Sequence, residues 1–191
     1  MSIFRPTVWK FVTSGGAEVD IGVSKFLFAA FEGGAFYAQQ DGDSTIYRLP
    51  FVGAGGGAGV GVSAGGVVSL SVSMPFQPGG GFRIYSNPLR FSGTVGLQDF
   101  AGPFVAITGA GAVGFSGSIS AIAFGAPSIL VNLISMAPLF GLAGRIDATI
   151  LACAGFGAIW GSAETSAAGV SATVYTGQIF APTQAAPGET G

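Results

Sequence analysis

The pattern with the clearest potential for covalent chemistry is Gly61-Val62-Ser63-Ala64-Gly65, which has the G-x-S-x-G form of a nucleophile elbow. In that motif the serine lies on a tight turn between a strand and a helix, and a general base, commonly histidine, takes its proton. The chain contains no histidine. We therefore interpret Ser63 as one small residue in a Gly/Ala/Ser tract and expect the protein not to be an enzyme.

Carboxylates could supply acid–base chemistry of the glycosidase kind, which needs two of them about 5 to 9 Å apart on facing elements. The chain has nine acidic residues, and no spacing between them selects a pair. The candidates are Glu18, Asp20, Glu32, Asp99 and Asp147. Because they stand as lone charges beside glycine turns, we interpret them as solvated loop residues.

The other ligand-binding patterns are incomplete. Residues 41–45 alternate oxygen-bearing side chains as a calcium loop does, but they lack its twelfth-position glutamate. Cys153 has no second cysteine or histidine as a partner, so we expect a buried small apolar residue. G-x-G-x-x-G at Gly57 and Gly59 fails at Val62, so this tract is not a phosphate loop. We expect neither a metal nor a cofactor.

The composition is closer to that of a membrane protein than of a soluble one. Only 8% of the 191 residues are charged, against roughly 25% in ordinary domains, and the mean hydropathy is +0.64. Residues 49–82 and 100–144 carry no charge, and each span exceeds the roughly 20 residues with which a helix crosses a bilayer. The seven basic residues are scattered and the net charge is −2, which excludes nucleic-acid binding.

Turn-forming residues and the alternation of apolar with polar or small residues predict a mainly β protein. Strands over residues 34–40 and 44–51 flank the turn at 41–43. Another strand pair lies in residues 17–31 and closes at 32–34. Further strands are expected at 68–74, 82–86, 89–97 and 104–124.

Between the glycine-rich segments, residues 128–137 are apolar nearly all round and follow Pro127, so we predict one short helix there. We predict a single domain over residues 1–180, with an antiparallel β-sandwich or barrel-like fold. Residues 181–191 form a flexible tail rich in proline, alanine and glycine.

Residues 53–65 carry two periods at once. With a period of two, glycines fill one face of a strand and leave room for bulky neighbours such as the phenylalanines. With a period of four, Gly53, Gly57, Gly61 and Gly65 form overlapping G-x-x-x-G units, which let helices pack closely in a bilayer. Glycine costs a helix about 1 kcal/mol relative to alanine in water, which favours the strand outside lipid.

The run of these four glycines in a small, nearly uncharged chain resembles the glycine-zipper pore-forming bacterial toxins, and most of all the membrane-depolarising effectors of type VI secretion systems. The resemblance covers residues 53–65. It implies insertion into the inner membrane of a neighbouring cell, ion leakage and a cognate immunity protein in the producing cell.

We therefore predict a non-enzymatic, membrane-targeting protein whose glycine-rich segments insert into a bilayer and cause ion leakage. Its partners are the lipid membrane, other copies of the chain, and an immunity or secretion-apparatus protein. The N-terminus has no secretory signal, so we expect synthesis in the cytoplasm and export by a route other than the general secretory pathway. The expected site residues are Gly53, Gly57, Gly61 and Gly65 for membrane packing, and Ser69, Ser71 and Ser73 for facing a watery lumen.

Two alternatives remain. The first is a self-assembling structural β subunit of a filament or particle, whose low charge reflects surface buried against other copies. The second is a β-barrel that binds an apolar ligand.

Overall fold

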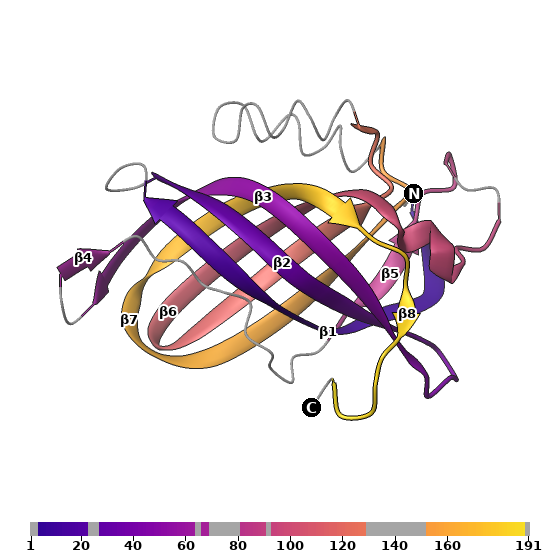
Figure 1. Cartoon of the computed structure of the whole chain (residues 1–191), viewed down its shortest axis with the longest axis horizontal. Coiled ribbons are helices and arrows are strands. Elements are labelled where there is room, and N and C mark those ends of the chain that lie inside the picture. Colours follow the sequence, from indigo (N-terminus) through magenta and orange to yellow (C-terminus); the bar gives the residue numbers. More distant parts are fainter. Residues whose placement is uncertain are drawn as a thin grey trace.

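The protein folds into a closed antiparallel β-barrel of eight strands, which confirms the predicted mainly β, barrel-like fold (Figure 1). The computed structural model describes residues 4–22, 27–63, 66–68, 81–90, 93–128 and 152–189. The elements in chain order are β1 (Arg5–Gly22), β2 (Leu27–Gln40), β3 (Ile46–Ser63), β4 (Gly66–Val68), β5 (Arg83–Ser86), the 3-10 helix η1 (Leu97–Phe100), β6 (Gly102–Phe124), β7 (Gly155–Ile179) and β8 (Thr183–Gln184).

Strand β7 closes the barrel. Strands β1, β2 and β3 form an antiparallel meander, and the late half of β7 pairs with β3 from Phe51 opposite Ile179 onward. The early end of β7 pairs with β5, where Phe156 lies opposite Tyr85, and β5 pairs with β1. These five strands therefore form a complete ring, which removes the open edges that an isolated sheet would present.

Strands β6 and β7 pair along nearly their whole lengths and fold back together at one end of the barrel (Figure 1). The register shift between Val113 and Phe115 marks the bend. Thr108 Oγ1 and Ser120 Oγ lie 2.8 Å apart, so the two arms of β6 face each other across the interior. We call the end with this bend the far end. The opposite end, which carries η1, β8 and the 41–45 turn, is the polar end.

The predicted hairpin around residues 41–43 is confirmed by β2 and β3. Gly42 has a φ of 81°, which a glycine adopts without strain. Asp43 Oδ1 accepts hydrogen bonds from the backbone N–H of Thr45 at 2.9 Å and from its hydroxyl at 2.8 Å. These local bonds fix the turn, which explains why short-range sequence signals were sufficient to find it.

The predicted turn at residues 32–34 is wrong, because β2 runs straight through them. Gly34 lies opposite Gly16 on β1 and opposite Phe51 on β3, so ladders on both sides hold the segment extended. A Cβ atom on Gly34 would lie 2.1 Å from the carbonyl oxygen of Gly15. Here glycine permits the close approach of two strands and does not make a turn.

Between β5 and η1, the predicted strand over residues 89–97 is also wrong in its described part. Leu89 and Arg90 lie in a turn, and η1 begins at Leu97. The buried Asn87 fixes this turn, since its side-chain amide donates to the carbonyl of Cys153 at 3.2 Å and its Oδ1 accepts from the Leu89 N–H at 3.0 Å. The predicted strand over 82–86 is confirmed by β5, and that over 104–124 by β6.

Residues 69–80 and 129–151 lie outside the described residues, and with them most of the predicted strand over 68–74 and of the predicted helix over 128–137. Strand β4 ends at Val68, and Ser128 is helical.

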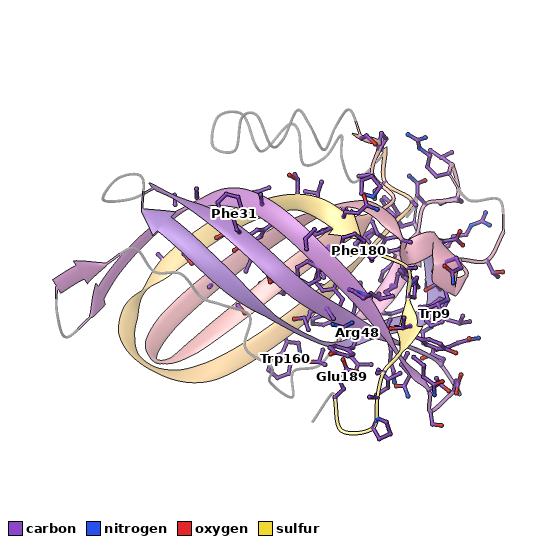
Figure 2. The ribbon with its side chains drawn as sticks, viewed as in Figure 1. Trp9, Phe31, Arg48, Trp160, Phe180 and Glu189 are labelled. Atoms are coloured by element: carbon purple, nitrogen blue, oxygen red, sulfur yellow. The ribbon has the colours of Figure 1, made fainter. Side chains whose placement is uncertain are left out.

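The segment predicted as a flexible tail contacts the outer surface of β2 and β3. In β8, Thr183 lies opposite Arg48, and the Ala185 N–H donates to the Ile46 carbonyl at 2.9 Å. The Tyr37 hydroxyl donates to Glu189 Oε1 at 3.2 Å, and Arg48 Nε lies 2.9 Å from the same oxygen (Figure 2). These contacts hold residues 183–189 against the barrel.

Cys153 is fully buried just before β7, as predicted, and desolvation raises the pKa of its thiol to about 11. Because the thiolate is the reactive form, we expect this thiol not to react with a thiol-specific reagent at pH 8 in the native state. Full reaction is expected in denaturant, and spectrophotometric thiol titration measures both. Rapid labelling of the native protein would contradict the burial of this residue.

Candidate functional site

The glycine-rich segment is a strand through Ser63, and its glycines at every second position from Gly53 face the barrel interior. Leu49 and Phe51 are buried in the core, and residues at every second position of a strand share its face. Gly53, Gly57 and Gly61 therefore lie on the inner face of β3. The other predicted site residues, Gly65, Ser69, Ser71 and Ser73, lie outside the described residues.

Several inner glycines provide the space in which phenylalanine rings sit. A Cβ atom on Gly177 would lie 2.7 Å from Cε1 of Phe104, and one on Gly53 would lie 3.3 Å from Cζ of the same ring. A Cβ atom on Gly157 would come within 2.6 Å of the Phe11 ring. The rings thus occupy the volume that side chains at these positions would fill, as the strand interpretation predicted.

Aromatic side chains fill the half of the barrel that adjoins the polar end. We call them the aromatic plug and divide them into two layers. The inner layer comes from the strands: Phe36 stacks on Phe51 with ring centroids 4.2 Å apart, and Phe104 packs edge-on against both. The mouth layer includes Phe100 of η1, which lies between Trp9 and Phe124 with centroid distances of 5.5 and 4.8 Å.

Toward the far end, several described inner positions are small or polar. Thr108 and Ser120 share a hydrogen bond, and Thr173 lies opposite both Thr108 and Gly57 in the ladders. Glu32 also lies on the inner face, because it is opposite Gly53 in the ladder. Buried Tyr175 and Ile159 share these inner faces, opposite Gly55 and Ser120 in the ladders, so the apolar content of the interior extends beyond the plug.

Glu32 corrects the expectation that the candidate acidic residues are solvated loop residues. It lies in the middle of β2 and is only 7% exposed. Glu18 lies opposite it on β1, and Asp99 lies on η1, where its Oδ2 accepts from the Gly96 N–H at 2.7 Å. The alternation of side chains along β2 places Phe31 and Gly33 on the outer face and Glu32 between them on the inner face. In the sequence alone, a single charge followed by two glycines resembles a turn, so this signal was missed.

The outer surface of the barrel carries exposed apolar side chains on several strands. On β2 and β3, Phe31 and Val52 are 52% and 50% exposed, and Val170 on β7 is 65% exposed. On the folded-back arms, Ile119 lies opposite Trp160, and both are exposed. We call these residues and the exposed alanines between them the apolar wall. Its members are Phe31, Val52, Ala54, Ile119, Ala121, Trp160, Val170 and Ala172.

Many of the charged residues that the structure describes gather at the polar end, whereas Glu18 and Asp20 on β1, Glu32 on β2 and Glu164 on β7 lie away from it. Figure 2 shows this end with the Arg48–Glu189 ion pair, while Phe31 and Trp160 lie on different sides of the barrel. Asp41 forms an ion pair with Arg83 there. The charged side chains at this end are Arg5, Lys10, Asp41, Asp43, Arg48, Arg83, Arg90, Asp99 and Glu189.

In the described ranges, no cluster of three or more potential metal-ligating side chains occurs. No helix among the described residues is long and apolar enough to cross a membrane.

The fold and this surface define a class of protein: a small closed β-barrel with exposed apolar residues on several strands and an interior that holds buried aromatic rings together with polar groups such as Glu32, Thr108 and Ser120. No family model, curated protein or solved structure matches the chain.

Proposed function

We propose that the protein is a membrane-inserting β-barrel that lets ions leak across the bilayer, with the apolar wall against lipid and the polar end in water. The observation that carries the proposal is the reversed polarity of the half-barrel toward the far end. There, Val52 and Val170 are half exposed on the outside, while the carboxylate of Glu32 is buried on the inside. Water-soluble barrels have the opposite pattern, and transmembrane barrels have this one.

The strand dimensions support the same proposal. A tilted transmembrane strand needs about 9–11 residues. Residues 52–62 of β3 are uncharged and are paired with β7 along this whole stretch. From Val52 to Ala58 the strand is paired with β7 on one side and with β2 on the other, so its backbone groups there need no water, which is the condition for residence in hydrocarbon.

The proposed leakage is supported by the small and polar side chains in the far half of the interior, together with the resemblance to glycine-zipper toxins. The far half supplies hydroxyl groups and one carboxylate beside glycines, which suit water and ions better than an apolar ligand. In the barrel form, the glycines contribute by keeping the inner surface of the strands free of side chains, and not by a helix zipper.

The alternatives use the same features differently. An assembling subunit would cover the apolar wall with other copies of the chain. A carrier of apolar ligands would need an apolar cavity, but the protein's own rings occupy the apolar part of the described interior.

Dye release from phospholipid vesicles tests the function. We expect micromolar protein to float with vesicles in a density gradient and to release an encapsulated small dye, while bovine serum albumin at equal concentration does neither. Protein that stays at the bottom of the gradient and forms regular particles by electron microscopy would overturn the proposal in favour of assembly. Flotation without release would leave insertion standing and refute the leakage.

A further inference from the structure

We propose that the interior of the barrel toward the far end binds a small inorganic cation at the carboxylate of Glu32. Binding of the cation does not depend on a membrane. Its consequence for leakage, a preference for cations over anions, rests on the proposed function.

Glu32 carries a carboxyl group that is buried without a partner. It is 7% exposed and lies on the inner face of β2, opposite Gly53 in the ladder. Along β2 it is two inner positions nearer the far end than Phe36 of the plug. Among the described residues, none donates a hydrogen bond to this carboxyl group or forms an ion pair with it. A carboxylate taken out of water without a partner is costly, and a cation beside it offsets that cost.

The pairing of β1 with β2 brings further acidic residues to the same face. Glu18 lies directly opposite Glu32, and Asp20 lies opposite Ala30, the next inner position of β2. Because paired residues share a face of the sheet, both acidic residues of β1 belong to the face that Glu32 occupies. Like charges directly opposite each other destabilise a ladder, in which the two Cα atoms are about 4.5–5.5 Å apart. A cation held between the two strands removes this repulsion.

No basic residue in the described part of the chain balances these charges. The described arginines and lysines all belong to the polar end, and they are Arg5, Lys10, Arg48, Arg83 and Arg90. Two of them form ion pairs with acidic residues of that end. Lys25 and Arg145 lie outside the described residues. Charges of one sign inside low-dielectric walls focus the electric field and raise the local concentration of counter-ions, which here are cations.

Hydroxyl groups supply neutral oxygen ligands in the same half of the interior. Thr108 Oγ1 and Ser120 Oγ lie 2.8 Å apart, and Thr173 lies opposite Thr108 in the ladder. Carboxylate and hydroxyl oxygens are hard ligands, which suit alkali and alkaline-earth ions. The described ranges hold no cluster of three or more acidic, histidine or cysteine side chains. Since the affinity of a calcium site rises with the number of its charged ligands, these observations favour a monovalent ion such as K⁺.

Thermal unfolding in an uncharged detergent tests the site without a membrane. We expect KCl to raise the melting temperature over choline chloride of equal ionic strength by about 3–6 °C, when K⁺ is at about ten times its dissociation constant. Glu32→Gln keeps the size of the side chain and removes its charge, so we expect this difference to vanish. Asp41→Asn is the matched control, because it removes one negative charge at the polar end. All samples are kept at about pH 9, where protons compete weakly with the cation.

The ion preference is measured in bilayers of uncharged phospholipid under a KCl gradient. From the zero-current potential of the wild type we expect K⁺ to permeate at least about tenfold better than Cl⁻. We expect Glu32→Gln to lower this ratio at least about threefold and Asp41→Asn to leave it unchanged. Circular dichroism is measured for every variant, and Glu18→Gln takes the place of Glu32→Gln if that variant does not fold.

The outcomes separate the site from the function. A potassium-dependent melting temperature that is lost in Glu32→Gln and kept in Asp41→Asn supports the site, and if the wild type then leaks no ions, the pore alone is refuted. Leakage without ion preference, combined with equal melting temperatures of the wild type in both salts, would overturn the site and leave the pore standing. A potassium effect that neither Glu32→Gln nor Glu18→Gln changes would also overturn the site, because the cation would then bind elsewhere.

Discussion

Replacing Val52 and Val170 together with arginine is expected to abolish vesicle insertion while leaving the barrel folded. Both side chains are at least half exposed on the apolar wall, so the fold loses little packing. In a transmembrane barrel, an outward arginine costs about 2–4 kcal/mol at the bilayer midplane. This corresponds to a partition into vesicles that is lower by roughly 30- to 1000-fold. Flotation over a range of lipid concentrations measures the partition, and circular dichroism measures the fold.

The matched control for this experiment is Leu89→Arg. Leu89 is 78% exposed in the turn at the polar end, outside the apolar wall. We expect it to partition like the wild type, because the proposal leaves this end in water. Equal flotation of the double variant and the wild type would show that the apolar wall does not face lipid. Loss of flotation by Leu89→Arg alone would place the polar end in the membrane instead.

Gly177→Ala is expected to destabilise the barrel strongly, whereas Gly109→Ala is not. An added Cβ on Gly177 would lie 2.1 Å from the carbonyl oxygen of Val52 and 2.7 Å from the Phe104 ring. Because a paired backbone cannot easily move away, we expect the cost of overpacking, about 1–3 kcal/mol or more. For a chain of this size that lowers the melting temperature by about 2–12 °C.

Gly109 is the matched control because it also lies within a long strand, β6, but a Cβ atom there meets nothing within 4 Å. We expect its alanine variant to keep the wild-type melting temperature within about 2 °C. Thermal unfolding followed by circular dichroism compares the two. Equal melting temperatures for both variants would mean that the barrel can accommodate a side chain between β3, β7 and Phe104 without loss of stability.

Local signals were enough where local bonds determine the structure. The hairpin at residues 41–43 was predicted because glycine and aspartate make the turn with their own atoms. The turn predicted at 32–34 failed because its glycines serve pairing with two other strands, which short-range reasoning does not include. Glu32 was misplaced for the same reason, since its burial depends on the ladders and not on its chain neighbours.

The candidate site was predictable only in part. The low charge and the uncharged residues 49–82 led to the prediction of membrane insertion, which stays a prediction, whereas the inward face of the glycines fits the strand interpretation of residues 53–63. The apolar wall was not predicted, because Ile119 and Trp160 become neighbours only when β6 and β7 pair. The plug was also missed, since Phe100 and Trp9 are far apart in the sequence and meet only at the mouth of the closed barrel.

The residues alone predict mainly β structure, and they show that the chain has no histidine. Without histidine it lacks the usual base for a serine nucleophile, and the alternation and turn residues require β structure. Only the tertiary structure decided which face of residues 53–63 is the inside. One face of this strand carries glycines and the other carries mainly alanine and valine, and since neither is charged, either could point inward; a slip of one residue exchanges them. Long-range pairing with β7 settles the register, and the Phe104 ring beside Gly53 and Gly177 fixes the glycines inward.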